Sequence, residues 1–392
     1  MKTTLVIFGI TGDLAGRKLL PALDSIIENK AGGDLSILGV SRRNVNVGEL
    51  LKDYPRLEPL ASVFTMDLAQ LTDYRRLKRL LDDDDADQIL FYLSVPPGAA
   101  ANIVDFLGQA DMNSSRFRVL FEKPFGFDYE SAKEFIERTG QYFKEEQLYR
   151  IDHYMAKEIA AEIIRMRRVA NSKQHHWGAQ TIKEVRVVAS EAIGVEGRAT
   201  FYEQTGALRD FIQGHLMQML SLVLVDEPGS APLPKERLEA LRFIELANPE
   251  KSVRAQYEGY QDEVGNPGST TETFAYVQLE SRDENWAGVP LRLISGKALS
   301  EKRSYVEIMY KDGTLDVFEE GKVHIAAGER QLDAYERVLL SAIAGDKEIF
   351  TTSDEVLASW IILAPIQEAW SMDSVPLRYY KPGLSVRGVV AK

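Results

Sequence analysis

The segment Glu146–Glu158, EQLYRIDHYMAKE, gathers side chains that could act together in chemistry. We predict that it forms part of a helix, so that His153 and Lys157, four residues apart, share one face. Such a pair could hold a phosphate dianion, with Tyr154 donating a third hydrogen bond. Asp152 would point about 100° away around the helix and could serve a different group. A solvated helix with ordinary ion pairs is the alternative, and it accounts for Lys157 better than for His153 and Tyr154.

A second candidate for chemistry is His215, within GALRDFIQGHLMQMLSLVLV at residues 206–225. Apolar residues recur here at helical spacing and predict one long helix from Leu208 to Val225. They are Leu208, Phe211, Ile212, Leu216, Met219, Leu220 and Val223. His215 falls on the same stripe, where a histidine is often a packed core residue. A buried imidazole with a carboxylate partner is also how a general base is built, and Asp152 could be that partner.

A glycine-containing turn follows the first apolar run of the chain. Residues 3–8, TTLVIF, predict a strand, and the pattern from 17 to 28 predicts a helix. The turn between them, GITGDLA at 9–15, matches G-x-G-x-x-G imperfectly, because Thr11 replaces the middle glycine and Leu14 the last. A strand that leads through such a turn into a helix can bind phosphate at the free N–H groups of the helix start. A plain tight turn is the alternative.

The end of the second predicted strand bears on the choice of coenzyme. LSILGV at 35–40 is followed by Ser41, Arg42 and Arg43. In NAD-binding folds an acidic residue at this strand end takes the ribose hydroxyls, whereas a cation suits the 2′-phosphate of NADP. Two solvated loop arginines are the alternative.

Further strand patterns predict two domains of different classes. Apolar runs at 88–95 and 116–122 alternate with helical segments, which is typical of an α/β domain with a Rossmann-like, doubly wound parallel sheet. After about residue 180 the strand patterns suit antiparallel pairing; they lie at 183–190, 271–280, 290–295 and 304–310. Helices are expected at 333–343 and 353–370. We predict an α/β domain at 1–150 and an α+β domain at 151–392 with a large, mainly antiparallel sheet.

Composition excludes several classes of protein. The 392 residues carry a net charge of −12, which argues against a nucleic-acid binder. Cysteine is absent, so disulfides and cysteine-based zinc sites are excluded, and the sequence contains no clear metal-binding cluster. The apolar run near the N-terminus is too short for a signal peptide, and no segment is long enough to span a bilayer. We therefore expect a soluble, cytoplasmic protein with no membrane partner.

Several long motifs, in order along the chain, resemble those of the glucose-6-phosphate dehydrogenase family. FGITGDLAGRKLLPAL is similar to that family's FGxSGDLAxRKLxPAL, and YRIDHYMAKE to its RIDHYLGKE. Further similar segments are FEKPFG, EGRATFYEQTGALRDFIQGHLMQML, GSTTETFAYV, VPLRLISGKALSEK and LDAYERVLL. The resemblance runs from the N-terminus to about Trp370. It implies an NADP-linked dehydrogenase that catalyses the first step of the oxidative pentose phosphate pathway, and a homodimer or homotetramer.

The resemblance also assigns roles to individual residues. The coenzyme turn would consist of Gly9, Thr11, Gly12, Asp13 and Leu14, with Arg42 on the 2′-phosphate. Lysines that reach the active site, close to substrate and coenzyme, would be Lys18 and Lys123. The sugar-phosphate site would use His153, Tyr154 and Lys157. Glu191 and Asp210 would hold the sugar hydroxyls, and Lys297 and Lys302 would be further basic substrate contacts.

The implied reaction is oxidation of the C1 hydroxyl of glucose 6-phosphate. His215 would take the hydroxyl proton, and hydride would leave C1 for the nicotinamide of NADP. Asp152 would orient the imidazole and stabilise its charged form. The product would be 6-phosphogluconolactone, and no metal is required.

The chain departs from the family pattern in three places. Gly214 stands where the family usually has Asn or a similar polar residue. The stretch at about 311–332, which in the family helps to form the sheet and supplies a glutamine contact to the sugar, is much shorter here. The C-terminal segment that builds a second, structural NADP site in some members has no counterpart, so that site is expected to be absent.

These departures leave two alternatives to the leading interpretation. One is a related dehydrogenase that acts on another phosphorylated sugar or uses NAD. The other is a catalytically silent, NADP-binding regulatory protein, which predicts the loss of a catalytic residue; none is lost in the matched motifs.

Overall fold

The structure is a computed structural model that describes residues 1–170, 177–226, 229–322 and 330–391. The chain forms two compact units. The first unit contains Met1–Gly126, Glu130–Ala156 and Arg330–Ser353. The second unit contains Phe127–Tyr129, Lys157–Glu329 and Asp354–Lys392.

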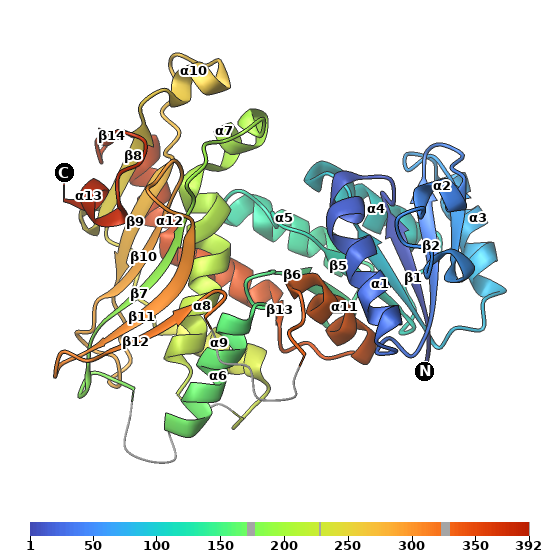
Figure 1. The fold of residues 1–392 in the computed structure, drawn as a ribbon, viewed down its shortest axis with the longest axis horizontal. Coiled ribbons are helices and arrows are strands. Elements are labelled where there is room, and N and C mark those ends of the chain that lie inside the picture. Colours follow the sequence, from blue (N-terminus) through green and yellow to red (C-terminus); the bar gives the residue numbers. More distant parts are fainter. Residues whose placement is uncertain (171–176, 227–228, 323–329, 392) are drawn as a thin grey trace. The chain divides into compact units, whose positions relative to one another are not determined.

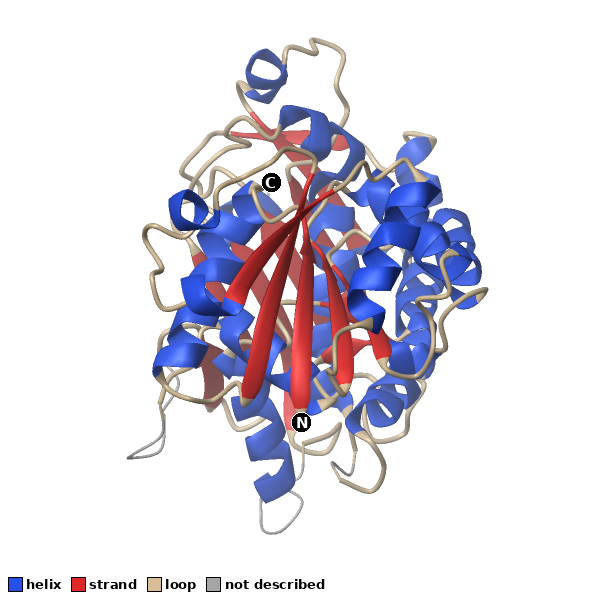
Figure 2. Cartoon of the chain, turned by 90° about the vertical axis from the view of Figure 1, so that its right-hand side faces the viewer, coloured by secondary structure: helices blue, strands red, loops and turns tan. Residues whose placement is uncertain are grey.

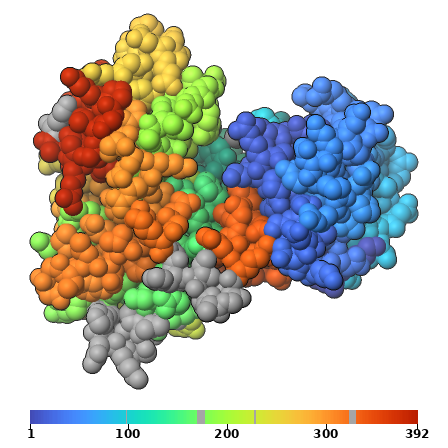
Figure 3. Space-filling model, viewed as in Figure 1, coloured from blue at the N-terminus to red at the C-terminus, as the bar shows by residue number. Residues whose placement is uncertain are grey.

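This division differs from the expected domains 1–150 and 151–392 in three respects: residues 151–156 belong to the first unit, Phe127–Tyr129 belong to the second, and a late segment, Arg330–Ser353, also belongs to the first. Helix α11 (Ala334–Ala344) is part of that segment and lies beside α1 (Leu20–Glu28) (Figures 1 and 3). Its buried residues Val338 and Leu339 join the same apolar cluster as Leu23 of α1. Packing against the first core, and not position in the sequence, therefore decides where this helix belongs.

The first unit is built on a seven-stranded sheet with the order β13-β6-β5-β4-β1-β2-β3. Its strands are β1 (Lys2–Phe8), β2 (Asp34–Ser41), β3 (Ala61–Thr65), β4 (Gln88–Leu93), β5 (Phe117–Phe121), β6 (Leu148–Ile151) and β13 (Phe350–Thr351). Strands β1 to β6 run parallel, and β13 pairs antiparallel with β6. Helices flank the sheet on both sides (Figure 2). This burial of both faces explains why every residue of β4 is buried and why the strand reads as a continuous apolar run.

The strand order places a topological switch point between β1 and β4. In the sheet, β4 lies on one side of β1, and β2, the next strand in the chain, lies on the opposite side of β1. In open α/β sheets, ligands bind at the carboxyl ends of the strands beside such a point. The strands expected at 3–8, 35–40, 88–95 and 116–122 are all confirmed, so the first unit has the predicted doubly wound sheet.

The helix predicted over 146–158 is wrong. Residues 148–151, LYRI, form the buried strand β6, which pairs with β5, and α6 begins only at Glu158 (Glu158–Ala170). Between them the chain makes a turn in which an oxygen of Asp152 accepts a hydrogen bond of 2.9 Å from the amide of Tyr154. Pairing with β5, a contact distant in sequence, overrides the local helical pattern. His153 and Lys157 therefore lie in a turn and do not share a helix face.

The second unit contains a second seven-stranded sheet, in the order β12-β11-β7-β10-β9-β8-β14. Its strands are β7 (Ile182–Ser190), β8 (Ser252–Tyr257), β9 (Phe274–Leu279), β10 (Leu291–Gly296), β11 (Arg303–Tyr310), β12 (Leu315–Glu319) and β14 (Leu377–Tyr380). Pairing is mainly antiparallel; β7 with β10 and β8 with β14 are the parallel pairs. The large, mainly antiparallel sheet is thus confirmed.

Helices lie along one face of this second sheet (Figure 1). The segment η4 (Leu208–Leu216) packs against β7, β9 and β10 and continues into α8 (Met217–Leu224). Contrary to the expectation of one regular helix, η4 is a π-helix, and a kink at Gly206 separates it from α7 (Ala199–Ala207). All eight residues of α8 are buried, so the predicted single apolar stripe becomes an element that is buried all round.

Each unit has further helical elements, and those named α are labelled in Figure 1. In the first unit they are η1 (Ala15–Leu19), α2 (Val47–Leu50), η2 (Glu58–Leu60), α3 (Leu71–Asp82), α4 (Pro97–Gln109), α5 (Tyr129–Gly140) and η3 (Glu145–Gln147). In the second unit they are α9 (Leu233–Arg242), η5 (Pro249–Lys251), α10 (Tyr260–Val264), α12 (Ser353–Ser371) and α13 (Val386–Val390). The shortened stretch at 311–332 supplies the edge strand β12, while its residues 323–329 lie outside the described part of the chain.

Candidate active site

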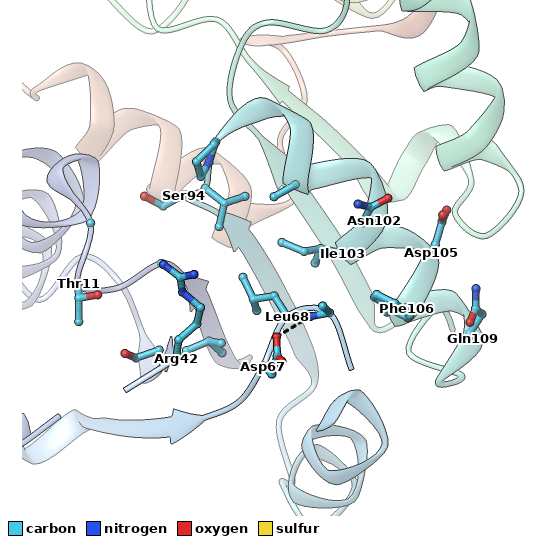
Figure 4. A pocket seen from close by; sticks show the side chains of 18 residues that line it. Thr11, Arg42, Asp67, Leu68, Ser94, Asn102, Ile103, Asp105, Phe106 and Gln109 are labelled. Atoms are coloured by element: carbon cyan, nitrogen blue, oxygen red, sulfur yellow. Dashed lines mark hydrogen bonds between the residues drawn. The ribbon is translucent and has the colours of Figure 1, made fainter. Parts of the chain in front are cut away.

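A cavity of about 790 Å³ opens at the switch point of the first unit (Figure 4). Four chain segments line it: the turn after β1, the end of β2, the residues that follow β3, and the end of β4 with helix α4. The residues that line the cavity include Gly9, Thr11, Gly12, Ser41, Arg42, Asp67, Ser94, Asn102, Asp105 and Phe106. Its size lies within the usual range for cavities that bind cofactors, roughly 300–1,000 Å³.

Glycine at position 9 is required by the close approach of two strand ends. Gly9 has φ +84, and a Cβ atom there would lie 2.2 Å from the carbonyl oxygen of Ser94. The amide of Gly12 donates to the carbonyl of Gly9 at 2.8 Å, which closes the turn. A backbone this close to the cavity, free of side chains at two positions, suits the pyrophosphate of a dinucleotide. The residues present therefore fit a nicotinamide coenzyme.

The other residues assigned to the coenzyme turn have different surroundings. Asp13 is exposed and forms an ion pair of 2.6 Å with Arg17, four residues later. Leu14 is partly buried and packs against the apolar core of the first unit. Neither residue lines the cavity. Of the five residues predicted for the coenzyme turn, Gly9, Thr11 and Gly12 therefore line it, whereas Asp13 and Leu14 do not.

Arg42 lines the cavity at the end of β2, as its position in the sequence predicts. Its neighbour Arg43 donates a backbone hydrogen bond of 3.1 Å to the hydroxyl of Ser41. The one carboxylate that lines the same end of the cavity among the described residues is Asp67, and its oxygen accepts from the amide of Ala69 at 2.9 Å (Figure 4). A cation thus stands at the end of β2, the strand end at which dinucleotide-binding folds place the residue that contacts the ribose.

Ser94 is a cavity residue that the sequence did not single out. It follows β4 directly, is 9% exposed, and its hydroxyl has no hydrogen-bond partner within the described part of the chain. Buried hydroxyl groups are normally paired. Its position at the carboxyl end of a predicted strand was a usable signal, but only the strand order shows that this end meets Gly9.

A second polar group of the first unit surrounds Glu122, the residue before Lys123. Tyr92 donates a hydrogen bond of 2.5 Å to the carboxylate of Glu122. Burial, and to a lesser extent the charge of Asp152, raise the pKa of Glu122, whereas Tyr92 and Lys123 oppose the shift, so that the resulting pKa is about 7. Glu122 therefore interacts electrostatically with both Lys123 and Asp152. The sequence did not single out Glu122, although it lies in the similar segment FEKPFG. The peptide bond between Lys123 and Pro124 is cis.

The turn after β6 holds two more of the predicted residues. The rings of His153 and Tyr154 meet edge to face, with centroids 5.1 Å apart. Tyr154 is buried and His153 is half-buried. Lys18 is exposed on η1, with its ammonium 6.0 Å from the ring centroid of Tyr335.

In the second unit, Glu191, Asp210 and Lys297 gather around the buried ring of Tyr202. Lys297 is buried, forms an ion pair with Glu191, and lies 5.1 Å from the ring centroid of Tyr202. Burial raises the pKa of Tyr202 well above its ordinary value, and the charges of Asp210 and Glu191 contribute to the shift. Two carboxylates and an ammonium group in one half-buried place can hold several hydroxyls of a sugar.

Tyr202 itself was not predicted, although it lies within the recognised segment EGRATFYEQTGALRD. Lys302 is exposed in the loop before β11, and within the described part of the chain no contact joins it to this group.

His215 lies on η4 with Asp210 and is buried, with 5% of its surface exposed. The ring of Phe211 meets its imidazole edge to face at 5.7 Å. Lys157, at the start of the second unit, forms an ion pair of 2.9 Å with Glu320. Asp152, the predicted partner of His215, belongs to the first unit.

Two features of the described residues concern metal binding and membrane crossing. No group of three or more His, Asp or Glu side chains there could hold a metal ion. None of the helices in those ranges has the length and apolarity that a bilayer crossing requires.

Comparison with known proteins covers nearly the whole chain. Residues 6–161 match the family model of the glucose-6-phosphate dehydrogenase NAD binding domain, and residues 165–332 and 322–386 match that of the C-terminal domain. Glucose-6-phosphate 1-dehydrogenase of Dickeya dadantii is 31% identical, over 97% of this chain and 93% of the relative. The enzyme of Rhizobium meliloti is 30% identical, over 96% and 93%. A relative from Arabidopsis thaliana, whose name includes "cytoplasmic", is 28% identical, over 97% and 88%.

Solved structures agree with these sequence matches. The crystal structure of glucose-6-phosphate 1-dehydrogenase from Mycobacterium avium superimposes with a TM-score of 0.86 at 29% identity, covering 98% of this chain and 94% of that one. A glucose-6-phosphate dehydrogenase in complex with glucose 6-phosphate superimposes with a TM-score of 0.89 at 24% identity, over 100% and 97%, and shows the shared fold. With both halves matched, the chain belongs to the glucose-6-phosphate dehydrogenase family.

Proposed function

We propose that this protein oxidises the C1 hydroxyl of glucose 6-phosphate to 6-phosphogluconolactone, with NADP as coenzyme, as the first step of the oxidative pentose phosphate pathway. The observation that carries the proposal is family membership over both units, together with a cavity at the switch point that is lined by Gly9, Thr11 and Gly12 of the predicted coenzyme turn. The catalytically silent alternative is disfavoured, because every predicted catalytic and binding residue is present in the sequence.

The coenzyme would be held in the cavity of the first unit. Gly9, Thr11 and Gly12 would leave room for the pyrophosphate, and Arg42 would contact the 2′-phosphate of NADP. When bound, the nicotinamide supplies the hydride acceptor of the reaction. Lys18 and Lys123 would contribute positive charge near the reacting groups.

The substrate would be held by its phosphate and by its ring hydroxyls. Lys157, with His153 and Tyr154 from the same turn, would bind the phosphate. The sugar hydroxyls would be held by the group around Tyr202, namely Glu191, Asp210 and Lys297. Lys302 would supply a further basic contact.

His215 would act as the general base and accept the proton of the C1 hydroxyl on its imidazole. Asp152 would orient that imidazole and stabilise its charged form. We also propose a cytoplasmic location, in line with the name of the Arabidopsis thaliana relative, and a homodimer or homotetramer, which light scattering would test.

The test is an assay of purified protein with glucose 6-phosphate and either NADP or NAD, followed by the absorbance of the reduced nicotinamide. We expect rapid reduction of NADP, slower reduction of NAD, and little activity with free glucose or with fructose 6-phosphate. Coenzyme binding without turnover on any sugar phosphate would contradict the proposal and favour the regulatory alternative. Equal or faster turnover with another phosphorylated sugar would replace the proposed substrate.

A further inference from the structure

The carboxylate of Glu272 is bonded to the start of the π-helix η4. Its Oε1 atom accepts a hydrogen bond of 2.9 Å from the amide of Leu208, and its backbone carbonyl accepts one of 3.0 Å from the amide of Ala207. Glu272 is 8% exposed. One residue thus satisfies two successive amides where η4 begins, groups that a helix cannot satisfy internally.

The backbone at this joint is shaped around the carboxylate. Gly206 has φ +59, and a Cβ atom there would lie 2.3 Å from Oε1 of Glu272. Any other residue at 206 would therefore displace the carboxylate or the turn. A negative group at the amino end of a helix is also favoured by the helix dipole. Burial raises the pKa of Glu272, and the hydrogen bond from Leu208 and the charges of Arg209 and Arg254 oppose that shift.

The segment 272–273 is also hydrogen-bonded to Lys297, another member of the proposed sugar-binding group. The carbonyl of Thr273, the next residue, accepts a hydrogen bond of 2.9 Å from the amide of Lys297. The amide of Thr273 donates to Ala255 at 2.8 Å, and its hydroxyl accepts from the amide of Tyr257 at 2.9 Å. Residues 272–273 therefore connect η4, which carries Asp210 and His215, to the strand end that carries Lys297.

We infer that Glu272 is a positioning residue, whose carboxylate fixes the start of η4 and thereby sets where Asp210 and His215 lie relative to Lys297. The inference rests on the proposed function for the roles of those three side chains. The hydrogen bonds that carry it are independent of that function. A displacement of about 1 Å of catalytic or binding groups can cost on the order of 100-fold in rate.

The test compares Glu272→Ala with Glu272→Gln. Alanine leaves the amide of Leu208 without its acceptor, so kcat/KM for glucose 6-phosphate should fall by about 10- to 100-fold. The Kd for coenzyme, which binds in the first unit, should stay within about twofold of wild type. Glutamine keeps an oxygen that can accept from Leu208, so Glu272→Gln should recover most of the lost activity.

The matched control is Glu236→Ala. Glu236 is another buried carboxylate of the second unit that accepts from backbone amides, those of Gly229 and Ala231, each at 2.9 Å. Its helix, α9, carries none of the proposed site residues. Glu236→Ala should lower the melting temperature without changing kcat/KM of the folded protein.

Amide hydrogen exchange supplies a readout that needs no activity. Exchange at residues 207–216 should become faster in Glu272→Ala and remain slow in Glu272→Gln and Glu236→Ala. Wild-type kinetics and exchange in Glu272→Ala would overturn the inference, as would an equal kinetic loss in Glu236→Ala. If Glu272→Ala does not fold, Glu272→Gln decides. The inference is overturned if folded Glu272→Gln loses more than tenfold in kcat/KM while its amide exchange at residues 207–216 stays slow. If wild type reduces neither coenzyme, the proposed function fails, while exchange at 207–216 still decides whether Glu272 orders η4.

Discussion

The ammonium group of Lys157 lies 2.9 Å from the carboxylate of Glu320 in the second unit. Both residues belong to the same compact unit, and the side chain of Lys157 is 15% exposed. The ion pair orders the lysine side chain before any ligand binds, so that little side-chain freedom is left to lose, and a phosphate would compete with Glu320 for the ammonium.

Replacement of Lys157 by alanine should raise KM for glucose 6-phosphate strongly. Loss of a desolvated, charge-assisted contact is worth roughly 2–5 kcal/mol, which corresponds to about 30-fold or more. Free glucose has no phosphate, so its already poor kcat/KM should change little. The matched control is Lys322→Ala, because Lys322 also pairs with a glutamate at 2.9 Å but is not a proposed ligand. An equal loss on both sugars would mean that Lys157 does not bind the phosphate.

Arg42→Ala should weaken NADP binding by on the order of 10- to 100-fold and leave NAD almost unchanged, because only NADP carries the 2′-phosphate. Equilibrium titration of each coenzyme measures the effect. Ser94→Ala is the control in the same cavity; loss of one neutral hydrogen bond should weaken both coenzymes alike, by about 2- to 10-fold. The assignment of Arg42 fails if its removal weakens NAD and NADP to the same extent.

His215→Asn should remain folded, bind glucose 6-phosphate about as before, and lose roughly 10²- to 10⁴-fold or more in kcat. Asp152→Asn should lose less, because the imidazole remains but is poorly oriented. The double variant should be little worse than His215→Asn alone, since the two residues act as one unit. Single-turnover measurements on folded protein decide the matter.

The pH profile supplies a second check on His215. A protonated imidazole cannot accept a proton, so kcat/KM of the wild type should fall on the acidic side, and His215→Asn should lose that limb. Near wild-type turnover in His215→Asn would return this histidine to a packing role.

Glu122→Gln should change how stability depends on pH. The pKa of Glu122 is raised from 4.5 to about 7 by burial, so the folded protein keeps a proton that the unfolded chain has released between these values. The contribution of Glu122 is therefore full below about pH 4.5 and is lost as pH rises through about 7. Glutamine does not titrate, so the melting temperature of the variant should rise relative to wild type across this window.

The control for this prediction is Asp73→Asn, also in the first unit. A hydrogen bond from the amide of Asp67 lowers the pKa of Asp73 below 3.8, so its contribution is present above that value and is lost as pH falls. Asp73→Asn should therefore lose stability at neutral pH. The same direction of change in both variants at neutral pH would contradict the role assigned to Glu122.

By itself, the sequence determined the elements whose patterns are local. The strands at 3–8 and 88–95 are continuous apolar runs, and the turn at 9–15 has the glycines that a close approach requires, so each could be predicted from adjacent residues alone. Motif order also predicted the family, because matching residues in register need no coordinates to be recognised.

Only the tertiary structure decided the elements that depend on distant partners. Residues 148–151 became a strand because β5 lies beside them, although their local pattern favoured a helix. Helix α11 joined the first unit because its apolar residues complete that core. Ser94 meets Gly9, and Glu272 meets Leu208 across 64 positions, through packing alone. Such contacts follow from how whole layers bury their apolar faces, which no short stretch of sequence encodes.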